Sequence, residues 1–243
     1  SVNWARVLAQ VVYYFSAYNQ LGQPTKFDVC VPTGNFGNAL AGFIAREMGA
    51  PVEKLIIGSN TNDILTRFFD TQNMQTNGVV ATLSPSMDIQ VSSNFERLLF
   101  EMNDRDGLAT ARQMSAFRSS GELRVEAEQY ATWATPVFRS ARCDDAETLA
   151  TMADVYRQSG LLIDPHTAVG LSAARQQGPS EVPVVTLATA HPAKFPEAVE
   201  RATGVHPELP EHLADLLERP EQSTSMGNDL AAVQSFVRSV AQG

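Results

Sequence analysis

Helical and strand-like spacings of apolar residues alternate along this chain. From Trp4 to Phe15 the apolar positions recur every three or four residues, and Gly22 and Pro24 follow, so the pattern predicts a helix that ends before Gly22. Residues 27–31 then alternate apolar and polar side chains, which predicts a short buried strand. A glycine-containing turn and an alanine-rich helical pattern come next, so the chain begins as helix, strand and helix.

The same two spacings continue toward the C-terminus. They predict further helices over residues 40–48, 64–69, 144–156, 164–176, from about 196 and over 230–240, and further strands over residues 54–58 and 182–187. Residues 84–142 are predicted to be mostly helical, and the pattern leaves their strand content open. Strands that alternate with helices favour a parallel α/β sheet, in which ligands bind beyond the carboxyl ends of the strands.

Polar residues with capping chemistry mark two of these helix starts. Asn62 precedes the apolar run at residues 64–69 and is expected to cap that helix. Asp144 and Glu147 have the spacing of a capping box, and Gly160 is expected to end the helix that they open.

The composition narrows the class of protein. The chain has 243 residues, 44% of them hydrophobic, which is enough for a buried core, and its formal net charge is −9. This acidic balance argues against a general affinity for nucleic acid or anionic membranes, and no apolar run approaches the roughly 20 residues that span a bilayer. The two cysteines form no disulfide framework, the four histidines lack metal-ligand spacing, and no signal-peptide pattern is present. We therefore expect a cytoplasmic protein without a metal site.

Residues 32–38, Pro-Thr-Gly-Asn-Phe-Gly-Asn, separate the first predicted strand from the helix after it. Gly34 and Gly37 allow positive φ angles or a close approach to a ligand, and the amides of Asn35 and Asn38 can donate hydrogen bonds to phosphate oxygens. The unpaired N–H groups of a helix start favour an anion as well. The pattern therefore predicts a phosphate-binding loop at residues 34–38, the glycine loop. An ordinary strand-to-helix turn with an Asn cap remains the alternative.

A second polar loop, Ala-Thr-Ala-His-Pro at residues 188–192, follows the last predicted strand. Two such loops in one parallel sheet can face one ligand, so Thr189 is a natural partner for the glycine loop. A phosphate at one end and a neutral hydroxyl at the other suit a flat aromatic cofactor such as pyridoxal phosphate. Thr189 is otherwise a plain strand-end threonine, and His166 and His191 either line the same cleft or cap helices.

A pyridoxal phosphate enzyme needs a lysine that forms a Schiff base with the cofactor. This chain has only Lys26, Lys54 and Lys194. Lys26 and Lys54 lie near the starts of strands, away from the expected site, and Lys194 is interpreted as a surface lysine at a helix start. The Schiff-base lysine is therefore expected outside these residues.

Six sequence blocks occur here in the order in which one enzyme family has them. They are Ser1-Val-Asn-Trp-Ala-Arg, Val-Pro-Thr-Gly-Asn-Phe-Gly-Asn, Asn-Thr-Asn-Asp-Ile-Leu-Thr-Arg-Phe, Thr82-Leu-Ser-Pro-Ser-Met-Asp-Ile with Ser92-Ser-Asn-Phe-Glu-Arg, Asp164-Pro-His-Thr-Ala-Val-Gly, and Ala188-Thr-Ala-His-Pro-Ala-Lys-Phe. Together they resemble the threonine synthases of the longer bacterial and fungal branch.

The resemblance implies a type II pyridoxal phosphate fold, like the tryptophan synthase β chain, with a three-layer large domain built on a parallel sheet. It also implies a lyase of threonine biosynthesis that converts O-phospho-L-homoserine and water to L-threonine and phosphate. By the same resemblance Thr189 approaches the pyridine nitrogen of the cofactor. The residues that hold the cofactor phosphate are implied to be Gly34, Asn35, Phe36, Gly37 and Asn38.

The family's Schiff-base lysine and its small mobile domain precede Ser1 in the full-length pattern. We therefore expect this chain to be a fragment and, taken alone, to be inactive. Residues 1–203 are expected to form the C-terminal part of the large domain, with a helical insertion at about 84–142. Residues 204–243 are expected to be a partly helical extension.

Four residues are weaker candidates for binding substrate. Ser1 and Asn3 open a helix in the family's Asn-Ser-x-Asn block, and they either face the active site or only cap that helix. Asn62 and Asp63 lie in the polar loop after the second predicted strand, where they either contact a ligand or cap the next helix.

Two other functions stay open. One is another lyase of the same fold, such as a serine or threonine dehydratase, which the block at residues 188–195 disfavours. The other is a non-enzymatic relative that binds phosphorylated ligands, and such a relative would lack the lysine.

Overall fold

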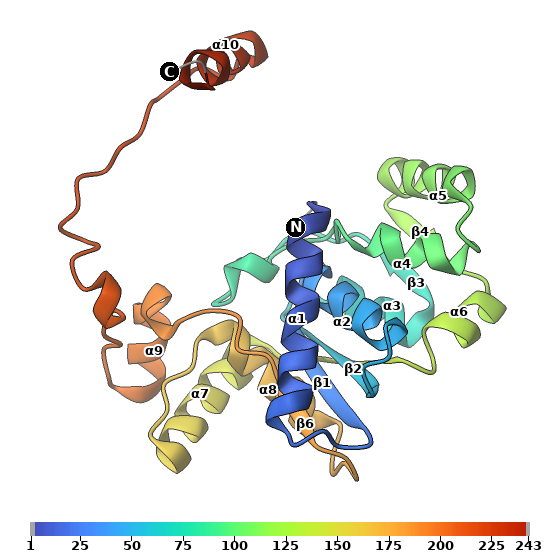
Figure 1. Ribbon diagram of the computed structural model, residues 1–243, viewed down its shortest axis with the longest axis horizontal. Coiled ribbons are helices and arrows are strands. Elements are labelled where there is room, and N and C mark those ends of the chain that lie inside the picture. The colour runs from blue at the N-terminus through green and yellow to red at the C-terminus, as the bar shows by residue number, and fades with distance from the viewer. Residues whose placement is uncertain (1–2, 242–243) are drawn as a thin grey trace. The chain divides into compact units, whose positions relative to one another are not determined.

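A computed structural model describes residues 3–241, and Figure 1 shows the order of their elements. The α-helices are α1 (Trp4–Gln20), α2 (Gly37–Glu47), α3 (Ile64–Thr71), α4 (Phe95–Met102), α5 (Gly107–Ser120), α6 (Ala127–Trp133), α7 (Asp145–Ser159), α8 (Pro165–Gln176), α9 (Pro196–Thr203) and α10 (Leu230–Ala241). The strands are β1 (Phe27–Pro32), β2 (Val52–Ser59), β3 (Asn73–Gln75), β4 (Glu122–Arg124), β5 (Phe138–Arg142) and β6 (Val184–Thr186). Short 3₁₀ helices are η1 (Pro85–Met87), η2 (Pro192–Lys194) and η3 (Glu211–Leu213).

The chain divides after Pro207 into two compact units. The first unit holds the sheet and the helices α1 to α9, and the second holds η3 and α10. Among residues 3–241 no helix combines the length and the apolar character that crossing a membrane requires.

Four parallel strands form the main sheet of the first unit, in the order β5-β2-β1-β6. Val31 of β1 pairs with Ile57 of β2, and Val29 pairs with Val185 of β6. Because the strands are parallel, their carboxyl ends lie along one edge of the sheet. The loops that follow β1 and β6 therefore start next to each other, and the parallel α/β sheet predicted from the sequence is confirmed.

Side chains from the central strands alternate between the two faces of the sheet. Val29 and Val31 belong to the core cluster that α1, α2 and α3 cover, whereas Cys30 and Ile56 pack against Ala173 of α8. Helices thus cover both faces, in three layers (Figure 1). A sheet buried on both faces explains why β2 is a continuous apolar run in sequence.

Glycines allow two helices to lie close to their neighbours. A Cβ atom at Gly42 of α2 would lie 2.6 Å from the ring of Tyr14 in α1 and 2.7 Å from Leu55. A Cβ atom at Gly170 of α8 would lie 2.9 Å from Pro32 Cδ. These contacts bring α1 onto α2, and α8 onto the carboxyl end of β1.

The capping predictions have different outcomes. The capping box of Asp144 and Glu147 is formed at the start of α7, and Gly160 ends that helix in a left-handed conformation. The predicted cap at Asn62 is wrong, because Asp63 is the N-cap residue of α3 and no side chain caps the helix.

Residues 84–142 hold η1 and the helices α4, α5 and α6, together with two strands. β5 joins the main sheet beside β2, and β4 pairs antiparallel with β3 in a separate two-stranded sheet. β4 and β5 have 3 and 5 residues, which is too short for periodicity to reveal them.

The close contact at Gly42 makes its replacement costly. We expect Gly42→Ala to lower the free energy of unfolding by about 1–3 kcal/mol, because the added methyl group would overlap the ring of Tyr14 and the side chain of Leu55. Gly78→Ala is the matched control, because a Cβ atom there meets no heavy atom within 4 Å. Urea unfolding of the full-length protein that carries this chain measures both, and equal stabilities of the two variants would refute the expectation.

Candidate functional site

The carboxyl end of β1 leads into the glycine loop. Phe36, the N-cap residue of α2, has a left-handed backbone conformation with φ 62° and ψ 6°. Its side chain is fully buried and contacts the rings of Phe69, Phe95 and Phe138 at centroid distances of 6.3, 5.6 and 5.7 Å. A left-handed conformation costs a non-glycine residue roughly 1–2 kcal/mol. The buried ring offsets that cost and fixes the turn by which the chain enters α2.

This turn leaves several backbone N–H groups unpaired. Within the described residues, the N–H groups without an acceptor include those of Gly34, Asn35, Gly37 and Asn38. Phe36 N, in contrast, donates to Thr33 Oγ1 at 3.1 Å. The first N–H groups of a helix carry partial positive charge from the helix dipole. The start of α2 therefore presents a set of donors suited to an anion.

Residues 92–94 hold the glycine loop through its acceptor groups. Ser92 Oγ donates to Gly34 O at 2.8 Å, and Ser93 Oγ donates to Asn35 Oδ1 at 3.2 Å. Asn94 donates to Asn35 O from its backbone N at 3.1 Å and from its Nδ2 at 2.9 Å. Residues 92–94 thus engage oxygens of Gly34 and Asn35, whereas the N–H donors of Gly34, Asn35, Gly37 and Asn38 remain available.

Tyr14 of α1 orients the Asn38 side chain. Its hydroxyl lies 2.7 Å from Asn38 O and 3.1 Å from Asn38 Oδ1. Burial, with a smaller contribution from Cys30, raises the pKa of Tyr14 far above its usual value, so the hydroxyl stays protonated and donates. Because Oδ1 accepts this hydrogen bond, the Nδ2 group of Asn38 is left as a donor at the cavity that Asn38 lines.

The glycine loop lines a cavity of about 250 Å³, the anion cavity. The other lining residues are Arg6 and Gln10 of α1, Pro32 and Thr33, Ser86 and Met87 of η1, His166 of α8, and Thr189, Ala190, Lys194 and Phe195 after β6. Among the described residues, neither Arg6 nor Lys194 has an acidic partner. Two cations without acidic partners among the described residues, beside unpaired N–H donors, favour an anionic ligand here, although the chain as a whole is acidic.

A larger hollow of about 590 Å³ shares Arg6, Asn38 and Thr189 with the anion cavity. Leu187 and Tyr13 add apolar surface to it. A flat ligand whose anionic end lies at the glycine loop therefore has room beyond that loop, next to Thr189.

The structure brings together the residues predicted to hold a cofactor. Gly34, Asn35, Gly37, Asn38 and Thr189 all line the anion cavity. The side chain of Phe36 points instead into the aromatic core, so this residue contributes only its backbone conformation.

Among the described residues, the weaker candidates Asn3, Asn62 and Asp63 do not line this cavity. Ser1 lies outside the described residues, and Asn3 caps α1 by accepting a hydrogen bond from Ala5 N at 2.9 Å. His191 caps η2 in the same way, through Ala193 N.

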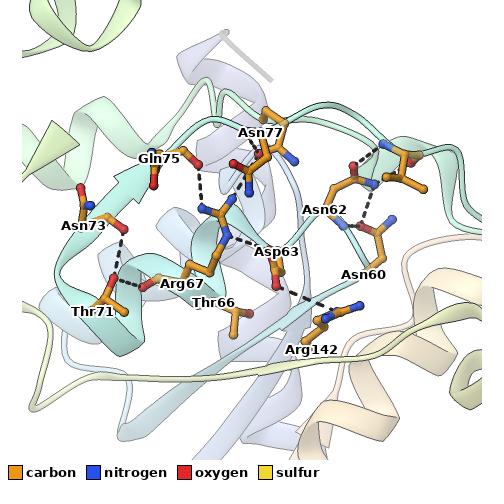
Figure 2. Close-up of polar contacts among 12 residues, drawn as sticks. Asn60, Asn62, Asp63, Thr66, Arg67, Thr71, Asn73, Gln75, Asn77 and Arg142 are labelled. Atoms are coloured by element: carbon orange, nitrogen blue, oxygen red, sulfur yellow. Dashed lines mark hydrogen bonds and ion pairs between the residues drawn. The ribbon is translucent and has the colours of Figure 1, made fainter. Parts of the chain in front are cut away.

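Asn62 and Asp63 belong to a polar network beside α3 (Figure 2). Asn62 Nδ2 donates to Val80 O at 2.8 Å and to Asp88 Oδ1 at 2.9 Å, while Val80 N donates to Asn62 Oδ1 at 2.9 Å. Asp63 pairs with Arg67 at 2.8 Å and lies 3.9 Å from Arg142. These two side chains therefore hold residues 80–88 and the start of α3 rather than face the anion cavity.

Sequence reasoning did not assign several residues that shape the site. Tyr14 lies in a helix whose pattern showed only a core face, and Ser86 and Met87 lie in a stretch without regular spacing. For Ser86 and Met87 the available signal was membership in the family-matching block at residues 82–89, which did not reveal what each side chain contacts.

Comparison with known proteins identifies relatives of this chain. A family model described as "Threonine synthase, C-terminal" matches residues 167–237. The threonine synthase of Pseudomonas aeruginosa is 54% identical over 240 residues, which cover 98% of this chain and 51% of that protein. The chain thus spans about half the length of the curated relatives that it matches.

Solved structures agree with the sequence matches. The structure of pyridoxal phosphate-bound threonine synthase from Brucella melitensis has a TM-score of 0.93 and is 45% identical in sequence to this chain. The match covers 100% of this chain and 52% of the Brucella melitensis chain. The yeast threonine synthase structure has a TM-score of 0.88 and is 34% identical, and the match covers 100% of this chain and 53% of the yeast chain. The three-layer fold of this chain is therefore the fold of the matched half of these enzymes, as the resemblance in sequence implied.

The hydrogen bonds from Tyr14 to Asn38 give a testable contribution to stability. We expect Tyr14→Phe to lower the free energy of unfolding by about 1 kcal/mol, because the buried ring stays and only the hydroxyl is lost. Tyr18→Phe, on the same helix, is the control with an expected change within about 0.5 kcal/mol, since the Tyr18 hydroxyl has no partner among the described residues. Urea unfolding compares the two, and a Tyr14→Phe effect no larger than the control would contradict the assignment.

Proposed function

This chain belongs to the threonine synthase family, as a portion that spans about half the length of its members, and we propose that it supplies the cofactor-phosphate site of a threonine synthase. The whole enzyme would convert O-phospho-L-homoserine and water to L-threonine and phosphate. The observation that carries this proposal is the set of unpaired N–H donors at the start of α2, which opens on a cavity shared with Thr189.

The residues of the anion cavity fit pyridoxal phosphate. Gly34 lies where a Cβ atom would be 2.9 Å from Met87 Cα, so only glycine leaves the loop in this position, with its N–H groups free for phosphate oxygens. The Nδ2 group of Asn38 adds a neutral donor. We therefore assign the cofactor phosphate to Gly34, Asn35, Gly37 and Asn38, with Phe36 holding the loop in shape.

Thr189 is the proposed neighbour of the pyridine ring. It lines both the anion cavity and the larger hollow beside it, so it lies where a ring attached to the bound phosphate would extend. When bound, the cofactor supplies an electron sink for the bonds of the substrate amino acid. A neutral hydroxyl beside the ring nitrogen leaves that nitrogen mostly unprotonated, which limits how strong the sink is.

Two cations of this chain would orient the anionic ligands. Arg6 and Lys194 line the anion cavity without acidic partners among the described residues, so their charge favours the phosphate groups of cofactor and substrate. Asn62 and Asp63 would act indirectly, by holding residues 80–88 beside the cavity. Asn3 would act at the start of α1, the helix that contributes Arg6.

The lysine that binds the cofactor covalently is proposed to lie in the part of the full-length protein that this chain does not include. Lys26 pairs with Glu53 at 2.9 Å, and Lys54 donates to Pro136 O at 2.5 Å, near the amino ends of the strands. Lys194 lines the anion cavity, at the phosphate end of the proposed ligand. We also propose a cytoplasmic location, which the two free cysteines, Cys30 and Cys143, support.

The proposal is tested on the full-length protein that carries this chain. We expect it to bind pyridoxal phosphate with visible absorbance, to retain the cofactor covalently after borohydride reduction, and to release phosphate from O-phospho-L-homoserine. Ammonia release from serine or threonine, without phosphate release, would favour a dehydratase instead. Phosphate-ligand binding without borohydride labelling would favour a non-enzymatic relative, and absence of all these signals would refute the proposal.

The glycine loop itself can be tested with one methyl group. We expect Gly34→Ala to weaken pyridoxal phosphate binding by about tenfold or more, because the new Cβ atom would lie 2.9 Å from the backbone of Met87 and displace the N–H donors. Gly107→Ala is the control, since a Cβ atom there meets its nearest neighbour only at 4.0 Å. Equilibrium titration of the apoprotein with cofactor measures both, and unchanged binding in Gly34→Ala would remove the glycine loop from the site.

A further inference from the structure

A buried carboxylate and a buried imidazole lie together at the start of α8. Asp164 is 0% exposed and His166 is 4% exposed, and Asp164 Oδ1 lies 2.9 Å from His166 Nδ1. Asp164 also accepts hydrogen bonds from the backbone N of His166 and of Thr167 and from the Thr167 hydroxyl. Burial alone raises the pKa of Asp164, but the hydrogen bonds from His166 and Thr167 outweigh burial and hold that pKa below its usual value. The carboxylate is therefore ionised and accepts.

The hydrogen bond at the second nitrogen of His166 indicates which tautomer of the ring is present. Its Nε2 lies 3.3 Å from the backbone N of Ser86, which can only donate. Nε2 must therefore accept, and the single ring proton of the neutral imidazole lies on Nδ1 and is donated to Asp164. The chain of hydrogen bonds runs in one direction, from Ser86 through His166 to Asp164.

One end of this chain of hydrogen bonds is Ser86, which belongs to η1, the segment that packs on the glycine loop. Ser86 and Met87 of η1 line the anion cavity, and Met87 Cα lies 2.9 Å from the Cβ position of Gly34. The ring of His166 also contacts Phe195, at a centroid distance of 4.8 Å, beside Lys194. From the start of α8, His166 thus contacts two segments that line the anion cavity, η1 and the loop after β6.

Capping of α8 does not account for the imidazole. The side chain of Asp164 already caps the helix through the backbone N of His166 and Thr167. Any apolar side chain could fill the space against Phe195, whereas a hydrogen bond to Ser86 N requires an acceptor at the position of Nε2. The position of Nε2 as this acceptor indicates that the imidazole of His166 acts on η1.

We propose that His166 is a positioning residue whose Nε2 atom holds η1 against Gly34 and thereby keeps the N–H donors of the glycine loop in place for phosphate. The inference rests on the proposed function, in that it concerns the affinity of the same cavity for an anion. The carboxylate of Asp164, the N-cap residue of α8, is hydrogen-bonded to the ring, and two cations, Arg6 of α1 and Lys194 of η2, line the same cavity as His166. The carboxylate of Asp88, which follows η1, is bound to Asn60, Asn62 and Thr82.

Two substitutions separate the two nitrogens of the imidazole. In His166→Asn the amide nitrogen takes the place of Nδ1 and can donate to Asp164, but the side chain is too short to reach Ser86. In His166→Gln the carbonyl oxygen reaches the place of Nε2 and can accept from Ser86 N, while the bond to Asp164 is lost. Both variants lose the aromatic contact with Phe195. If His166 only filled space, the two substitutions would therefore weaken phosphate binding equally.

The test compares these variants in the full-length protein that carries this chain. We expect His166→Asn to weaken binding of pyridoxal phosphate and of inorganic phosphate to the apoprotein by about tenfold, and to speed hydrogen exchange at the Ser86 amide. His166→Gln is expected to restore both measurements to within about threefold of the original protein. The fold-changes correspond to the loss and the return of one hydrogen bond.

Each possible result either supports the positioning role of His166 or overturns it. Equal losses in the two variants, or a Ser86 amide that exchanges at the original rate in His166→Asn, would overturn the positioning role. If the original protein binds no pyridoxal phosphate, the proposed function fails. The Ser86 exchange and phosphate titrations still judge His166 in that case, so the two failures can be told apart.

Discussion

Phe36 has a left-handed backbone conformation, and the anion cavity depends on how the protein holds it there. The conformation costs a non-glycine residue roughly 1–2 kcal/mol, and burial of a phenylalanine side chain contributes roughly 1.5–3 kcal/mol in the opposite direction. The ring lies among the aromatic residues of α3, α4 and β5. Elements far apart in sequence therefore stabilise the turn that leaves the N–H groups of the glycine loop unpaired.

Three parts of the chain then determine which atoms of the glycine loop remain available. Residues 92–94 donate hydrogen bonds to oxygens of Gly34 and Asn35, and Tyr14 donates to the oxygens of Asn38. The third part is η1, which packs on Gly34 and donates a hydrogen bond to His166 from Ser86 N. All three leave N–H donors free, and Arg6 and Lys194 add positive charge at the same cavity. Local geometry thus favours an anion at this cavity, although the protein as a whole is acidic.

Local order in the sequence predicted which loops lie together. The glycine loop and Thr189 each follow a strand, and parallel strands place such loops at one edge of the sheet, where both line the anion cavity. Local reasoning failed at Asn62, which has the chemistry of a cap but hydrogen-bonds to Asp88 and Val80 instead. An amide side chain binds the partner that tertiary structure brings to it, and a partner 18 or 26 residues away is invisible to local spacing.

The order of residues alone determined the alternation of helices and strands, the parallel sheet, and a turn with two glycines between a strand and a helix, because these follow from periodicity and from backbone preferences of single residues. Only the tertiary structure decided that Phe36 serves through its backbone and that Tyr14, Ser86 and His166 belong to the site. Ser86 and His166 are 80 residues apart, and their contact exists because α8 packs on the carboxyl end of β1. Such contacts depend on the packing of whole layers, which no local pattern contains.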